Sequence, residues 1–81
     1  MRIGVKLFAV ARQRVGRDVV ELELSGEPTV RMLRGALADQ YPALADVLPH
    51  VRFAVNSEYA GDAQAIPATA EVAVIPPVSG G

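Results

Sequence analysis

Two runs of alternating apolar and polar residues near the N-terminus predict a pair of β-strands, at residues 2–10 and 18–24. In the first run, one face consists of Ile3, Val5, Leu7 and Ala9, and the other of Gly4, Lys6, Phe8 and Val10. In the second run, the inward positions are Val20, Leu22 and Leu24. Residues 11–16 between the strands form a short connection of about one helical turn that ends at Gly16. Because so few residues separate the two strands, we expect them to pair as an antiparallel hairpin.

An apolar residue at every third or fourth position then predicts one amphipathic helix. The turn cluster Ser-Gly-Glu-Pro at residues 25–28 precedes it, and Thr29 is a suitable N-cap. The apolar stripe consists of Val30, Leu33, Leu37 and Tyr41. Pro42 restricts the residue before it, so the helix should end there. Residues 43–48 are then at most a further short turn.

The second half of the chain has the pattern of two more strands with a poorly patterned segment between them. The inward positions of these strands are Val51, Phe53 and Val55, followed in the last strand by Val72 and Val74. Residues 56–58 predict a turn, because asparagine tolerates the left-handed backbone that such turns use. Residues 59–70 predict a short strand or a loop. The last strand, at residues 71–75, should end where Pro76 and Pro77 cannot donate to a ladder.

This order of elements predicts an α+β domain with a β-grasp, or ubiquitin-like, fold. One main helix must cover a mixed sheet of four to five strands, because the sheet needs its apolar face buried. The simplest packing places the first and last strands side by side at the centre and the third strand at an edge. We therefore expect a β-grasp domain over residues 1–77 and a flexible Gly-Gly tail over residues 78–81.

Composition and charge exclude several classes of function. The formal net charge is −1, so nothing favours binding to nucleic acid or to an anionic membrane. The chain has no cysteine and a single histidine, His50, which argues against a resident metal or thiol catalysis. No apolar run approaches the ~18 residues of a membrane span, and the N-terminus lacks the layout of a signal peptide. We expect a cytoplasmic protein with no bound cofactor that is not a complete enzyme on its own.

The C-terminal residues have the one pattern that indicates chemistry. The sequence finishes Pro76-Pro77-Val78-Ser79-Gly80-Gly81. Two prolines favour a stiff, extended exit from the last strand, and two glycines give a thread that can enter a narrow active site. The carboxylate of Gly81 is a sterically open acyl group, which an ATP-dependent enzyme can convert to an acyl adenylate.

A candidate docking patch follows from the same alternation. The positions that face away from the helix include Lys6, Phe8, Ala54, Ala73 and Ile75. Since the first and last strands should be neighbours, Phe8, Ala73 and Ile75 would form one exposed apolar patch. Such patches on small domains often bind partners.

The chain resembles the MoaD family of ubiquitin-like sulfur carriers, the small subunits of molybdopterin synthase, over its whole length. The motifs that carry the resemblance are Lys6-Leu7-Phe8-Ala9 with Arg12 and Gly16, Thr29-Val30 with Leu33, Tyr41-Pro42-Ala43-Leu44, Ala54-Val55-Asn56-Ser57-Glu58-Tyr59, and Glu71-Val72-Ala73 running into Ile75-Pro76-Pro77-Val78-Ser79-Gly80-Gly81. The last of these is the most specific.

The resemblance implies a sulfur-transfer cycle. An adenylyltransferase partner would use ATP to adenylate Gly81, and sulfur would replace the adenylate to give a terminal thiocarboxylate, a 1-thioglycine. The tail would then enter the large synthase subunit and donate sulfur to cyclic pyranopterin monophosphate, forming the molybdopterin dithiolene. The family assembles as a heterotetramer. By position, Gly80 and Gly81 would be the reactive end, and the partner-binding residues would be Phe8, Arg12, Tyr59, Ile75, Pro76, Pro77, Val78 and Ser79.

Three alternatives share parts of this pattern. A carrier of the same fold could serve thiamine or cysteine biosynthesis, or a protein modifier could be joined through Gly81 to lysines of other proteins. A non-covalent adaptor with an inert tail is the third. The residues before the diglycine and the overall resemblance favour the molybdopterin pathway.

Overall fold

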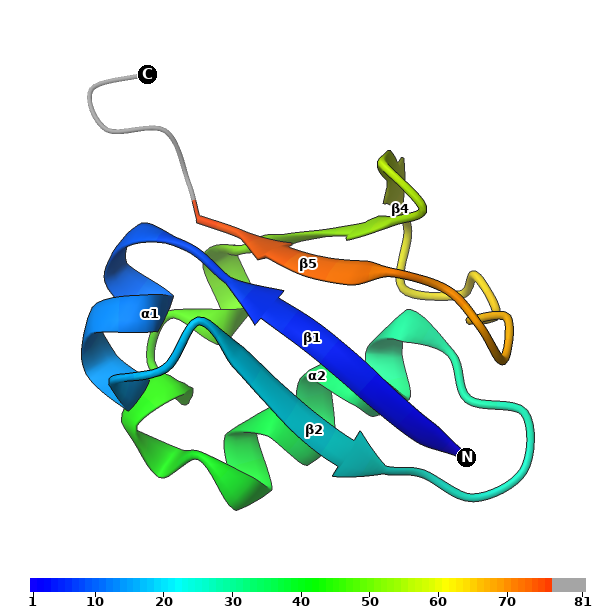
Figure 1. Cartoon of the computed structure of the whole chain (residues 1–81), viewed down its shortest axis with the longest axis horizontal. Coiled ribbons are helices and arrows are strands. Elements are labelled where there is room, and N and C mark those ends of the chain that lie inside the picture. The colour runs from blue at the N-terminus through cyan, green and yellow to red at the C-terminus, as the bar shows by residue number, and fades with distance from the viewer. Residues whose placement is uncertain (77–81) are drawn as a thin grey trace.

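The computed structural model describes residues 1–76, which form a five-stranded sheet with two α-helices and two short 3-10 helices (Figure 1). The strands are β1 (Arg2–Leu7), β2 (Val19–Glu23), β3 (Arg52–Val55), β4 (Glu58–Ala60) and β5 (Val72–Ile75). The helices are α1 (Ala9–Val15) and α2 (Val30–Gln40), with 3-10 turns η1 (Pro42–Leu44) and η2 (Leu48–His50). Pro77, the expected tail at residues 78–81 and with it the expected reactive end, Gly80 and Gly81, lie outside the described residues.

The strand order is β2-β1-β5-β3-β4, with the first and last strands paired in parallel at the centre. Every other neighbouring pair of these five strands is antiparallel. Figure 1 shows α2 crossing one face of this sheet. The predicted mixed sheet, its covering helix and the β-grasp arrangement are therefore confirmed. The edge position predicted for the third strand is wrong, because β4 pairs with the outer side of β3 and becomes the edge itself.

The first strand is shorter than its alternating pattern indicates. β1 ends at Leu7, and the chain turns directly into α1, a helix of seven residues rather than a single turn. Ala9 has a φ of 49°, in the left-handed region, which makes this turn sharp. As a result Ala9, predicted to face inward, is exposed, and Ala11 is the residue of α1 that enters the core.

The core lies between the inner face of the sheet and α2. Its members from the strands are those predicted from alternation, except that Leu24 follows the end of β2 and is half-buried. Phe53 is fully buried at the centre. The apolar stripe of α2 contributes Val30, Leu33 and Leu37. The side chain of Thr29 accepts a hydrogen bond from the Met32 amide at 3.3 Å, so the predicted N-cap is confirmed. Among the described residues, none of the helices is long and apolar enough to cross a membrane.

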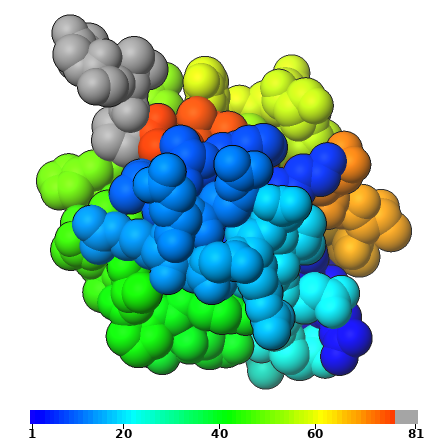
Figure 2. Space-filling model, turned by 60° about the vertical axis from the view of Figure 1, so that its left-hand side comes forward, coloured from blue at the N-terminus to red at the C-terminus, as the bar shows by residue number. Residues whose placement is uncertain are grey.

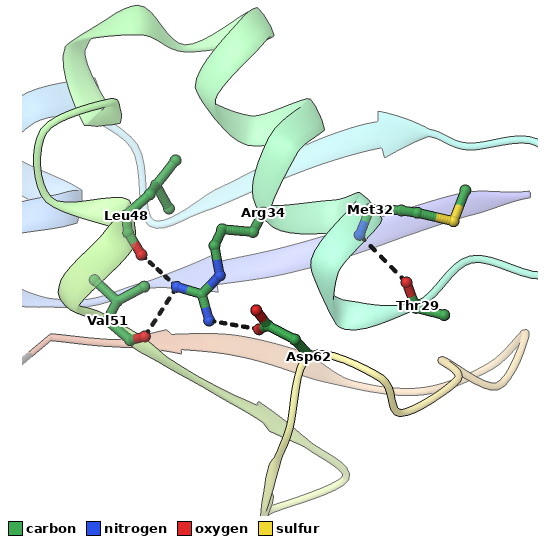
Figure 3. A network of polar contacts seen from close by, with 6 residues as sticks. All are labelled: Thr29, Met32, Arg34, Leu48, Val51 and Asp62. Atoms are coloured by element: carbon green, nitrogen blue, oxygen red, sulfur yellow. Dashed lines mark hydrogen bonds and ion pairs between the residues drawn. The ribbon is translucent and has the colours of Figure 1, made fainter.

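One polar network, absent from the sequence-based expectations, fastens α2 to the segments that follow it (Figure 3). The Arg34 guanidinium donates to the carbonyl oxygen of Leu48, to that of Val51 at 3.1 Å, and to the Asp62 carboxylate at 2.9 Å. It also lies over the Phe53 ring, 4.9 Å from the ring centroid. These contacts tie η2 and the start of the 61–70 loop to the same helix.

Candidate functional site

The face of the sheet opposite α2 carries a hollow of about 420 Å³. Its floor follows from the strand register: Ala54 of β3 lies opposite Ala73 of β5, and Ala73 lies opposite Lys6 of β1. Residues directly opposite one another share a face of the sheet, so two alanines occupy its middle. Small side chains at the middle, with larger ones around them, make this face concave.

Aromatic and aliphatic side chains form the rim of the hollow. Phe8 follows β1, and its side chain is 46% exposed although it is large and apolar. Tyr59 of β4 also lines the hollow, 64% exposed, and the Arg52 guanidinium lies 5.1 Å from its ring centroid. Ile75 completes the apolar part of the rim and is half-buried. Exposed aromatic residues around a concavity are typical of sites where a partner docks.

One ion pair joins the floor of the hollow to its rim. Lys6 Nζ lies 3.7 Å from the Glu71 carboxylate, and both side chains are more than half exposed. Glu71 is held in place by its backbone, since its amide donates to Asn56 Oδ1 at 3.0 Å and its carbonyl accepts from the Asn56 amide at 2.8 Å. Asn56 and Ser57 have φ values of 52° and 70°, so the left-handed turn predicted at Asn56 is confirmed.

The hollow lies at the base of the C-terminal segment. Ile75, the last residue of β5, lines it, and the next residue, Pro76, is half-buried. Leu7 of β1 pairs with Val74 of β5, and the two strands are parallel. Phe8 and Ile75 are the next residues of the two chain segments, so they lie at the same end of the sheet. Figure 2 shows the red atoms at the end of β5 exposed beside the blue atoms where β1 passes into α1. A partner seated in the hollow would therefore also meet the start of the segment that leads to Gly81.

The predicted docking residues do not all come together. Phe8, Tyr59 and Ile75 line the hollow. Arg12 lies on α1 and is not among the lining residues; its guanidinium pairs with Asp18 at 3.5 Å. Of the approach residues, Pro76 is described, whereas Pro77, Val78 and Ser79 lie outside the described residues together with Gly80 and Gly81. The roles assigned to these residues remain predictions.

The lining also includes Val72, which is buried as predicted, and two residues that the sequence reasoning missed, Ser57 and Glu71. Ser57 lies in a turn, where alternation gives no direction for a side chain, whereas Glu71 has the same parity as Ala73 and Ile75 in the expected strand 71–75 and could have been found from it. Residues 1–76 contain no group of three or more His, Cys, Asp or Glu side chains placed to hold a metal ion. The lining of the hollow, a concave apolar face with one ion pair, is suited to contact with a partner.

Comparison with known proteins gives a family match across nearly the whole chain. A model described as the ThiS family matches residues 5–81. A Caenorhabditis briggsae protein named molybdopterin synthase sulfur carrier subunit is 37% identical over 81 residues, which cover 98% of this chain and 96% of that protein. An Arabidopsis thaliana protein with the same name is 35% identical, over 100% of this chain and 84% of that protein.

A solved structure shows the same architecture. The crystal structure of SAMP1 from Haloferax volcanii, a small archaeal modifier protein, superposes with a TM-score of 0.86 at 32% identity and covers 100% of both chains. The matches to carriers and to a modifier both extend over the whole domain, including the strands that form the hollow.

Proposed function

The chain belongs to the ThiS family, and on that premise we propose that it is the sulfur carrier subunit of a molybdopterin synthase. The observation that carries the proposal is the full-length similarity to two proteins with that name, at 37% and 35% identity. The chain's own C-terminal sequence, Pro-Pro-Val-Ser-Gly-Gly, and the hollow beside its starting point support the same function.

The proposed reaction takes place at the carboxylate of Gly81. An adenylyltransferase partner joins this carboxylate to the α-phosphate of ATP, forming an acyl adenylate and releasing pyrophosphate. A sulfur nucleophile then attacks the carbonyl carbon, AMP leaves, and the terminus becomes a thiocarboxylate, or 1-thioglycine. The sulfur passes from there to cyclic pyranopterin monophosphate in the large subunit, and two such deliveries complete the dithiolene.

The body of this chain has a binding role in the cycle. The hollow docks the protein on its partners, so that the residues after Pro76 are presented to an active site that those partners supply. Gly80 and Gly81 have no side chains to obstruct insertion. The chain is thus a donor within a complex rather than an enzyme on its own.

A second candidate is a protein modifier, favoured by the similarity to SAMP1 at a TM-score of 0.86. A modifier would share the adenylation step but would end in an amide bond to a lysine of another protein. Denaturing electrophoresis followed by peptide mass spectrometry separates the two: only a modifier gives thiol-resistant bands of higher mass that contain peptides of other proteins.

The test of the proposal is the mass of the chain after incubation with its activating enzyme, ATP and a sulfur donor. We expect the wild type to gain the difference between a sulfur and an oxygen atom, and chains that lack Gly81 or carry one extra residue after it to gain nothing. Gly61→Ala is a matched control that should load normally, because a β-carbon added at Gly61 would meet no atom within 4 Å. Normal loading of the Gly81-deleted chain would remove the tail from the mechanism.

A second experiment tests the proposal with the large subunit of the synthase. Loaded wild-type chain, mixed with the large subunit and cyclic pyranopterin monophosphate, should form molybdopterin. Formation of a thiolated thiamine or cysteine precursor, with no molybdopterin, would assign the carrier to another pathway.

A further inference from the structure

The chain has a single lysine, Lys6, and its seven other basic residues are arginines. It also has no cysteine. Among side chains, an amine or a thiolate attacks an activated acyl group most readily, whereas the arginine guanidinium keeps its proton and does not. The amine of Lys6 is therefore the one strong side-chain nucleophile for an activated carboxyl group in the whole sequence.

This amine is accessible and lies in the hollow described above. The Lys6 side chain is 55% exposed, and its Nζ is 3.7 Å from the Glu71 carboxylate. The register places Lys6 directly beside Ala73, on the floor of the hollow, and Phe8 lines the same hollow. A group attached to Nζ would therefore extend outward from within the docking surface.

We propose that Lys6 is an acceptor site for the activated carboxyl end of a second copy of this chain, and that this linkage closes the docking hollow. The activation of Gly81 is taken from the proposed function, so that step rests on it. The unprotonated Nζ attacks the Gly81 carbonyl carbon of the acyl adenylate, a C–N bond forms, the C–O bond to the phosphate breaks and AMP leaves. The second proton of the amine passes to water, and no oxidant or reductant is needed.

The linkage would close the hollow to a partner for two reasons, the loss of a positive charge and the presence of the attached residues. An amide at Nζ has no positive charge, so the ion pair to Glu71 is lost. The attached residues would extend from Nζ within the hollow of about 420 Å³, where a partner would otherwise sit. Docking and self-conjugation thus exclude each other, and a docked partner protects the amine from the chain's own reactive end.

The acceptor role can be tested without any activating enzyme. A Gly81 thioester of the full chain, prepared by thiol cleavage of an intein fusion, is mixed with unmodified chain over a series of increasing pH values. We expect a covalent dimer, lighter than two monomers by one water, whose yield rises with pH and whose linkage maps to Lys6 by peptide mass spectrometry. This readout stands even if enzymatic loading fails, so the proposed function and the acceptor role can fail separately.

Matched variants locate the site. Lys6→Arg keeps the charge beside Glu71 and should abolish the linked dimer. Linkage at the Met1 α-amine, which donates to the Leu24 carbonyl oxygen at 2.7 Å, would overturn the proposal, as would a cyclised monomer or an undiminished dimer in Lys6→Arg.

Closure of the hollow needs a binding measurement. The wild-type chain is acetylated with sulfosuccinimidyl acetate and titrated against the large subunit. We expect the affinity to fall at least about tenfold. The control is the double variant Lys6→Arg/Arg31→Lys, whose single lysine lies on the exposed side of α2. Its acetylation should leave affinity unchanged; an equal loss in the control, or no loss in the wild type, would show that acylation at Lys6 does not close the hollow.

Discussion

Arg34 is the side chain on which the polar contacts between α2 and the later segments converge. Its guanidinium donates hydrogen bonds to the carbonyl groups of Leu48 and Val51 and to the carboxylate of Asp62. The same group lies over the Phe53 ring. Its Nε is buried and has no hydrogen-bond partner among the described residues. The planar fork of arginine suits this arrangement, since a lysine ammonium cannot reach several acceptors in fixed directions.

Replacing Arg34 should therefore destabilise the fold. We expect Arg34→Met, which keeps most of the aliphatic stem, to lower the free energy of unfolding by about 2–4 kcal/mol, because hydrogen bonds to charged groups are lost and carbonyl groups are left without donors. Urea denaturation measures the effect. Arg31→Met, on the exposed side of the same helix, is the control and should change it by less than about 0.5 kcal/mol; equal effects of the two variants would argue against the network.

Asp46 has a carboxyl group whose pKa is shifted by a neighbouring side chain. The hydrogen bond from Arg14 lowers the pKa of its carboxyl group below the ordinary value of 3.8. A carboxylate with a lowered pKa stabilises the fold above the pKa of the unfolded chain, and the contribution is lost as the pH falls through the lower pKa of the folded chain.

The stability of the wild type relative to Asp46→Asn should thus be constant near neutral pH and decline below about pH 4. The pair is exposed at the surface, so the difference should be small and should shrink further in high salt. Denaturation of both proteins across this pH range tests it. A difference that stays constant down to the lowest pH would mean that the carboxylate does not contribute.

At the scale of elements, alternation and helical periodicity predicted most of the fold. The β1–β2 hairpin and the β1–β5 pairing agree with the structure because one buried face dictates them. Thr29 is the N-cap because its side-chain oxygen accepts a hydrogen bond from the first turn of the helix. The end of β1 did not follow from the pattern, since Phe8 and Ala9 continue the alternation while the backbone turns at Ala9. The short β4 was undecided for a similar reason: three residues at an edge bury too little to leave a pattern.

The lining of the hollow was predictable in part for the same physical reason. Lys6, Ala54 and Ala73 follow from their register, as strand residues facing away from the core. Glu71 has the same parity as Ala73 in the expected strand 71–75 and could have been included, whereas its hydrogen bond to the distant Asn56 depends on the fold. The Arg34 network depends likewise on segments brought together only by the fold.

The outer position of the rim residues makes binding and folding separable. We expect Phe8→Ala to lower stability by less than about 1 kcal/mol, since the ring is 46% exposed, and Ile75→Asp to reduce affinity for the large subunit at least about tenfold. Phe53→Ala is the matched control, because its ring is fully buried and its loss should cost about 3–5 kcal/mol. Titration calorimetry measures the binding of each variant, and thermal melts measure its stability. A large stability loss in Phe8→Ala with unchanged binding would refute the assignment of Phe8 to the rim.

At the scale of the whole molecule, we expect the body and the C-terminal residues to have separate tasks. Within residues 1–76, every buried core residue lies between Ile3 and Val74. The sheet and its covering helix are complete before Pro76, and the described core lies between them.

Truncation after Pro77 should consequently leave the thermal midpoint nearly unchanged and eliminate molybdopterin formation in the reconstituted synthase. The truncated chain should still bind the large subunit measurably through the hollow, although more weakly. Circular dichroism melts and titration of the large subunit test the two halves of this statement. Unfolding of the truncated chain would make the tail part of the packing, and a folded chain without binding would place docking in the tail.

The position of β5 has a consequence for how the protein comes to fold. β5 lies at the centre of the sheet and joins the β2-β1 hairpin to the β3-β4 hairpin, yet it follows all four of those strands in the sequence. Until β5 joins them, the two hairpins have no strand between them, and the sheet closes only when β5 pairs with both β1 and β3. Such long-range pairing favours slow folding, in milliseconds or longer rather than microseconds. Prematurely terminated chains would lack the central strand and remain substrates for proteolysis, so the folded bodies that partners meet are those whose synthesis has passed Ile75.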